Sequence, residues 1–80
     1  MKTPRPIYEI AQEIKDDWNN VYFGAVPYLR AMFNIEMLSD YYGQDDAKSV
    51  LLYFLSNART WRGPTARRIK SELKTILGVK

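Results

Sequence analysis

The stretch AKSVLLYFLSNARTWRG, residues 47–63, decides which fold this 80-residue sequence can adopt. Five of its apolar residues recur at intervals of three and four, which is the spacing of one helix face. They are Ala47, Val50, Leu51, Phe54 and Ala58. Leu52, Tyr53 and Leu55 extend apolar surface around nearly the whole circumference. A helix that is apolar all round is normally buried, so we predict a central helix over about 46–58 that the other helices contact on more than one side.

Trp61 follows this helix and allows two interpretations. If the helical rotation continues past Ala58, Trp61 falls close to the stripe of Val50 and Phe54 and can pack as its last member. The alternative is that TWRGPTARRIKSELK, residues 60–74, opens a nucleic-acid-reading helix of the helix-turn-helix kind. We predict that Trp61 is mainly a packing anchor, because the strongly apolar VLLYFL helix is a poor match to a helix-turn-helix unit.

Three further helices are predicted from their start and stop signals. Thr3 followed by Pro4 begins a helix over about 4–18, because proline at the first helical position loses only an amide that would be unpaired anyway. A second helix runs from near Gly24 to about Asn34, with an end that could lie as far as Leu38, and has Pro27 in its first turn. The last helix begins at Gly63-Pro64, carries a clean apolar stripe and is capped by Gly78.

The segment SDYYGQDD, residues 39–46, has the composition of a turn. Gly43 supplies a positive backbone angle there, and Asp45 or Asp46 caps the helix that follows. Together these patterns predict an all-α fold, a compact bundle of about four short helices with residues 1–80 forming a single domain.

Composition excludes several kinds of chemistry. The sequence has no cysteine and no histidine, so it cannot form a disulfide or a zinc site built from those ligands. The commonest general base and the best nucleophile are missing as well. The four glycines are scattered, so no phosphate-binding loop exists. We therefore predict a protein that is not an enzyme, with no catalytic residues, cofactor or metal.

Charge is divided unevenly along the chain. Residues 1–58 carry five basic and eight acidic side chains, whereas residues 59–80 carry seven basic side chains and one acidic. Arg67, Lys70 and Lys74 lie within about 60° of one another on the last helix; we call them the basic strip. Glu9, Glu13 and Asp16 form a matching acidic strip on the first helix. The basic strip is a solvated flank, a partner of the acidic strip, or a docking site for phosphate or an acidic protein surface.

Tyrosine is abundant, with six residues in the chain. Such rings suit either the edge of a small core or a recognition surface. Tyr41 and Tyr42, beside a turn glycine, are the pair that we expect to be exposed. The candidate partner-binding residues are Arg59, Arg62, Arg67, Lys70, Lys74, Tyr41 and Tyr42.

The sequence also favours one cellular setting. Its first residues contain no continuous apolar run of the kind that a secretory signal needs. The longest apolar run, VLLYFL, is far shorter than the roughly 20 residues that span a bilayer. We therefore expect a cytoplasmic protein with no membrane partner.

Three segments resemble a small uncharacterised family of proteins that phages and mobile elements of bacteria encode. They are DDWNNVYFGAVPYLRAM at 16–32, AKSVLLYFLSNARTWRG at 47–63 and TARRIKSELK at 65–74. The resemblance implies a bacterial cytosolic setting and an accessory role, and brings no site residues with it. We expect a noncatalytic adaptor or inhibitor that binds a protein partner. A nucleic-acid-binding accessory protein that uses the basic face of the C-terminal helix is the alternative, and a homo-oligomer is compatible with either.

Overall fold

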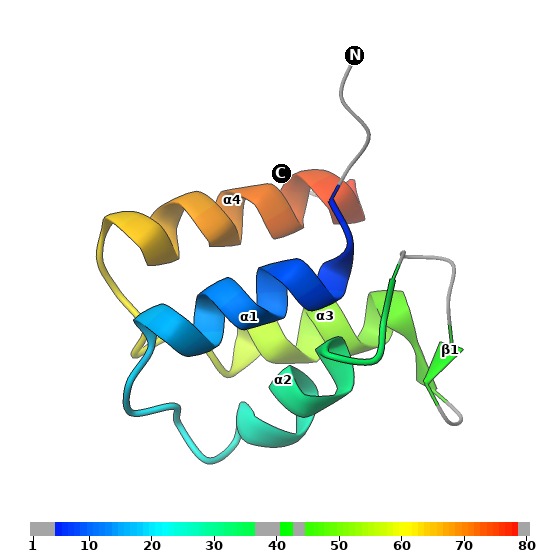
Figure 1. Ribbon diagram of the computed structural model, residues 1–80, viewed down its shortest axis with the longest axis horizontal. Coiled ribbons are helices and arrows are strands. Elements are labelled where there is room, and N and C mark those ends of the chain that lie inside the picture. The colour runs from blue at the N-terminus through cyan, green and yellow to red at the C-terminus, as the bar shows by residue number, and fades with distance from the viewer. Residues whose placement is uncertain (1–4, 37–40, 43–44, 79–80) are drawn as a thin grey trace.

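The computed structural model describes residues 5–36, 41–42 and 45–78. Within these ranges it has four helices and one short antiparallel strand pair (Figure 1), and it confirms the predicted all-α bundle. The elements are α1 Ile7–Asp17, α2 Val26–Met32, β1 Tyr41–Tyr42, β2 Asp45–Asp46, α3 Ala47–Ser56 and α4 Pro64–Leu77. None of the described helices combines the length and the apolar character that crossing a bilayer requires.

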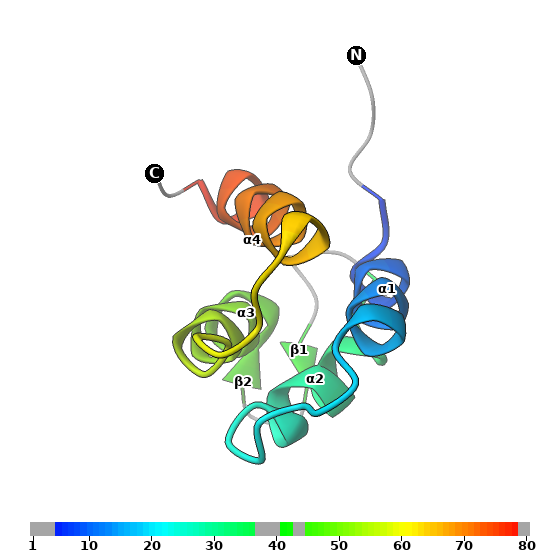
Figure 2. The ribbon, with the colours of Figure 1, turned by 90° about the vertical axis from the view of Figure 1, so that its left-hand side faces the viewer.

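The four helices lie around a common centre (Figure 2). Helix α1 packs against α2 and α4, and α3 packs against the same two helices from the other side. The buried side chains come from all four helices and form one apolar cluster. Nine large side chains in this cluster are essentially inaccessible: Phe54, Ile7, Ile10, Ile14, Met32, Ile35, Leu51, Ile69 and Leu73.

Helix α1 begins at Ile7, later than the residue near 4 that the Thr3-Pro4 signal predicts. Thr3 and Pro4 lie outside the described residues. The first two amides of the helix donate to the segment that follows α2, Ile7 to the carbonyl of Glu36 and Tyr8 to that of Ile35, both at 3.0 Å. These contacts satisfy two of the amides that a helix start leaves unpaired, which ties the beginning of α1 to the end of the α2 region.

Helix α2 has Pro27 in its first turn, as predicted, and ends at Met32, two residues before the expected limit. The chain then tightens, because the amides of Phe33, Asn34 and Ile35 donate to carbonyls three residues earlier. This turn carries Ile35 into the core, where it is completely buried.

Helix α3 begins at Ala47, because residue 46 belongs to β2. The predicted turn at 39–46 therefore contains a short strand pair, in which Tyr41 pairs with Asp46 and Tyr42 with Asp45. Gly43, expected to have a positive backbone angle, lies outside the described residues.

The prediction that α3 is contacted on more than one side is confirmed, but two large apolar side chains on its outer face are exposed. Contacts with α2 and α4 cover two sides of the helix, as expected. Leu52 and Tyr53, however, are 39% and 50% exposed. The helix occupies one corner of the bundle instead of its centre, so one of its faces meets solvent.

Helix α4 begins and ends as predicted. Gly63 precedes Pro64 with a φ of 117°, an angle that is strained for any residue with a Cβ. Gly78 closes the helix in the left-handed conformation at a φ of 77°, and its amide bonds the carbonyls of Lys74 and Thr75. The two glycines therefore set the limits of the helix that carries the basic strip.

Candidate functional site

Trp61 anchors the connection between α3 and α4. It is 2% exposed, and its ring stacks on Trp18 with centroids 5.6 Å apart and planes 12° from parallel. Phe54 packs against the same indole in an edge-to-face arrangement, with the ring centroids 6.4 Å apart. The indole Nε1–H donates to the Asp17 carboxylate over 2.8 Å. The predicted packing role of Trp61 is therefore confirmed, and the contact joins the α3–α4 connection to the end of α1.

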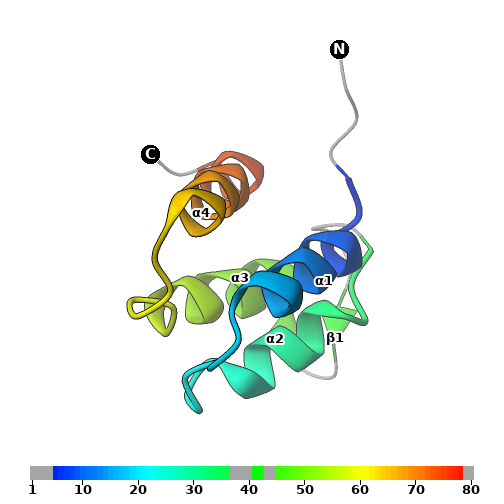
Figure 3. The ribbon, with the colours of Figure 1, turned by 60° about the vertical axis from the view of Figure 1, so that its left-hand side comes forward.

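The route by which Trp61 reaches the core differs from the prediction. Helix α3 ends at Ser56, so Trp61 does not continue its apolar stripe. The chain turns instead, with the Trp61 amide donating to the carbonyl of Ala58 at 3.2 Å. Figure 3 shows this connection leaving α3 and doubling back to α4.

A shallow pocket of about 240 Å³ lies beside the anchor, at the start of α4. Its lining includes Arg62, Arg67 and Lys70. The Lys70 ammonium donates to the Trp61 carbonyl at 2.6 Å and lies 5.9 Å from the centroid of the indole ring. Two of the three residues of the basic strip thus meet Arg62 at one concave place, and Lys74 lies one turn further along the helix.

The charges at this place are not neutralised by any residue that the structure describes. Burial lowers the pKa of Lys70, and the neighbouring positive charges of Lys74 and Arg62 lower that pKa further. No acid contributes to this shift in the opposite direction. Among the residues that the structure describes, no ion pair includes Arg59, Arg62 or any residue of the basic strip.

Pairing between α1 and α4 exists, but it uses other cations. Arg5 bridges Glu13 at 2.6 Å and Glu72 at 2.8 Å, and Arg68 pairs with the second oxygen of Glu13. Asp16 accepts a hydrogen bond from Gln12 at 2.9 Å. The interpretation in which the basic strip pairs with the acidic strip is therefore wrong. The sequence did not indicate the role of Arg5, because its partner Glu72 lies far away along the chain.

Acidification is expected to weaken the fold through Glu13. The hydrogen bond from Arg5 is the main cause that lowers the pKa of this carboxylate below its ordinary value of 4.5. A lowered pKa in the folded state stabilises the fold above about pH 4.5, and this contribution is lost as the pH falls through the folded-state pKa. Urea unfolding at pH 6 and pH 3 should show a smaller pH-dependent loss in Glu13→Gln than in the wild type. An equal loss in both proteins would contradict this role.

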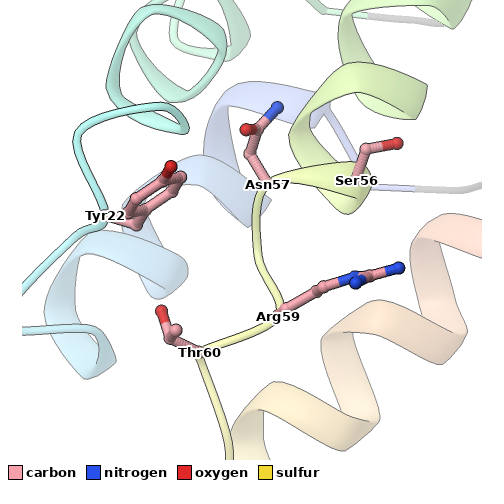
Figure 4. Close-up of a pocket in the computed structure, with 5 residues that line it drawn as sticks. All are labelled: Tyr22, Ser56, Asn57, Arg59 and Thr60. Atoms are coloured by element: carbon pink, nitrogen blue, oxygen red, sulfur yellow. The ribbon is translucent and has the colours of Figure 1, made fainter.

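A second shallow pocket, of about 300 Å³, lies on the other side of the α3–α4 connection (Figure 4). It is lined by Tyr22, Ser56, Asn57, Arg59 and Thr60. Phe23, next to Tyr22, is 79% exposed. Sequence reasoning selected Arg59 but missed the aromatic pair. The signal that could have found it is the sequence Tyr22-Phe23-Gly24, in which two large rings stand in a turn outside both helical stripes.

The predicted contact residues Tyr41 and Tyr42 are described only in their backbone, as the strand β1. Exposure of their rings stays a prediction. Within the described part of the chain, no three acidic side chains are grouped so that they could hold a metal ion.

The architecture and surface define the class of molecule: a small all-α bundle with a cationic, shallowly hollowed face around the α3–α4 connection. No family model matches the chain, and neither the curated proteins nor the solved structures contain a match to it.

Proposed function

We propose that this protein is a noncatalytic accessory protein that binds an acidic surface of a protein partner, as an adaptor or inhibitor. The observation that carries the proposal is the unneutralised positive charge of the basic strip together with Arg62. A phage or mobile-element origin belongs to the same proposal and rests on the resemblance given above.

The contrast between paired and unpaired cations supports this function. Arg5 and Arg68 meet acids of the same chain, whereas the Lys70 ammonium has only positive neighbours among the causes of its lowered pKa. Like charges held close together repel, and an acidic partner removes that repulsion when it binds. Complementary charge also accelerates association and selects among partners.

A protein partner is favoured over duplex DNA by the connection between α3 and α4. A helix-turn-helix unit joins its two helices by a turn of about three or four residues. Here residues 57–63 separate the helices, and Trp61 fastens this longer connection to Trp18 and Asp17. Arg67 and Lys74 are exposed on the same helix, so phosphate binding is the second candidate function.

The proposal predicts that Arg62→Gln/Arg67→Gln/Lys74→Gln slows association with the partner by about tenfold or more, because the steering charge is removed. Lys70 is kept, so its bond to the Trp61 carbonyl survives. The partner is first captured from a nuclease-treated lysate of the native host, and the association rate of each variant is then measured. The melting temperature confirms that each variant is folded.

The matched control is Lys15→Gln/Arg30→Gln/Lys48→Gln, which removes the same net charge from exposed side chains elsewhere. It should bind nearly as the wild type does. Equal binding by both triple variants would contradict the proposal. If nuclease treatment abolishes capture, the result would favour nucleic-acid binding. In that case the slope of log affinity against log salt concentration should fall by up to about three units in the Arg62/Arg67/Lys74 variant.

A further inference from the structure

The turn between α1 and α2 exposes an aromatic pair. The rings of Tyr22 and Phe23 lie 4.8 Å apart between centroids, and Tyr22 is 43% exposed and Phe23 79% exposed. Phe23 is the most exposed of the large apolar side chains that the structure describes. Its ring contributes little to the core, so folding alone does not explain a phenylalanine at this position. Exposed apolar surface beside polar groups is typical of an interaction site.

Tyr22 is held in place by close packing over Gly24. A Cβ at this glycine would lie 2.6 Å from the Tyr22 ring and 2.8 Å from the Asn57 side-chain oxygen, so both groups close over the bare backbone. The Asn57 amide nitrogen donates to the Tyr53 carbonyl at 2.8 Å, which fixes the side chain. This packing joins the turn before α2 to the end of α3, and the second pocket forms between them.

The pocket combines an apolar wall with one positive charge. Figure 4 shows the Tyr22 ring on one side and the Arg59 side chain extending away from it toward α4. Arg59 makes no ion pair with any described residue, and none of the described lining residues is acidic. Asp17, at the end of α1, accepts a hydrogen bond from the Trp61 indole instead. A ligand here therefore meets an aromatic surface first and an unpaired guanidinium next to it.

We infer that Tyr22, Phe23, Asn57, Arg59 and Thr60 form a binding site, here called the Tyr22–Arg59 surface, for an acidic linear segment of a protein. A large apolar side chain of the segment packs on Tyr22 and Phe23, and a carboxylate of the same segment pairs with Arg59. Further acids continue toward Arg62 and the basic strip. The inference rests on the proposed function and names the chemistry of its partner.

Ring geometry favours a peptide over single-stranded nucleic acid. Such strands stack successive bases on aromatic faces along a positively charged groove. The Tyr22 and Phe23 rings are tilted by 55° against each other and so do not offer two parallel faces to neighbouring bases. Arg59 is the one cation that lines this pocket, which suits a side-chain carboxylate better than a run of phosphates.

The test uses a displayed library of random twelve-residue peptides selected on the immobilised, full-length protein. We expect the enriched peptides to carry two or more acidic residues next to a large apolar residue. Fluorescence anisotropy of one such peptide should show that Phe23→Ser and Arg59→Gln each raise the Kd by about tenfold, as loss of a central contact does. Melting curves confirm that both variants fold.

Two matched controls should change the Kd by less than about twofold, since they remove similar groups elsewhere. Tyr8→Ser removes an exposed ring from α1, and Lys48→Gln removes a charge from the opposite end of α3. A library without enrichment, enriched peptides without acids, or wild-type affinity in Phe23→Ser would overturn the inference. Tight binding of a labelled oligothymidine to the wild type, with that binding lost in Phe23→Ser, would also overturn it.

The two proposals fail separately. Peptide binding by Phe23→Ser tests the Tyr22–Arg59 surface. The proposed function is tested by partner capture with the triple variant Arg62→Gln/Arg67→Gln/Lys74→Gln. If the triple variant no longer captures the partner but Phe23→Ser binds the peptide as the wild type does, only the inference is overturned. Weakened peptide binding by Phe23→Ser with normal capture by the triple variant would overturn only the function assigned to the basic strip.

Discussion

Trp61→Ala is expected to lower the free energy of unfolding by about 3 to 5 kcal/mol, the range for truncating a large aromatic side chain in a core. The indole is 2% exposed and contacts both Trp18 and Phe54, so its removal leaves a void that two rings line. A domain of this length has a total stability of only about 4 to 12 kcal/mol. The melting temperature should therefore fall by more than about 12 °C.

Trp61→Phe separates packing from hydrogen bonding at this position. Phenylalanine keeps an aromatic ring against Trp18 but lacks the donor to Asp17. Because the Asp17 carboxylate is exposed and can bind water instead, this variant should lose clearly less stability than Trp61→Ala. An unchanged melting temperature in Trp61→Ala, with partner binding lost, would show that Trp61 is a contact residue and not an anchor.

Leu51→Ala is expected to cost about 2 to 5 kcal/mol, whereas Leu52→Ala should cost about 1 kcal/mol or less. The two leucines are neighbours in α3, but Leu51 is completely buried and Leu52 is 39% exposed. Alanine is a better helix former than leucine, so helix propensity cannot explain a loss at either position. Urea unfolding of the two variants under identical conditions measures the difference.

The leucine pair also tests where α3 sits in the bundle. If α3 were surrounded on all sides, both substitutions would leave cavities and their costs would be similar. Similar costs would therefore contradict the corner position of this helix. A large difference, with equal helix content by circular dichroism, is the expected result.

Local periodicity is enough to predict most of the helices. The stripe of α4, its start after Gly63 and its end at Gly78 were all correct, because each depends on residues within a turn or two of one another. The start of α1 was wrong, because its first amides bond to the carbonyls of Glu36 and Ile35, which are distant in sequence. Apolar composition also overstated the burial of α3, since composition does not say how many neighbours a helix has.

The candidate surfaces were predicted only in part. A pattern of charge along the sequence located the basic strip, and the structure shows which cations of the chain are neutralised. Arg68 and Glu72 are four residues apart on α4, yet Arg68 pairs with Glu13 and Glu72 pairs with Arg5. The aromatic pair at Tyr22 and Phe23 was missed, because exposure in a turn depends on what packs over it, here the approach of Asn57 to Gly24.

By itself, then, the sequence determined the all-α class, the helical stripes, the glycine limits of α4 and the exclusion of thiol and imidazole chemistry. Only the tertiary structure decided that Trp61 is held by Trp18 and Asp17, that Leu52 faces solvent and that the basic strip has no internal counter-ion among the described residues. The physical reason is range. Helix periodicity arises from hydrogen bonds between residues four apart, whereas burial and ion pairing depend on distances between segments that only the packed bundle brings together.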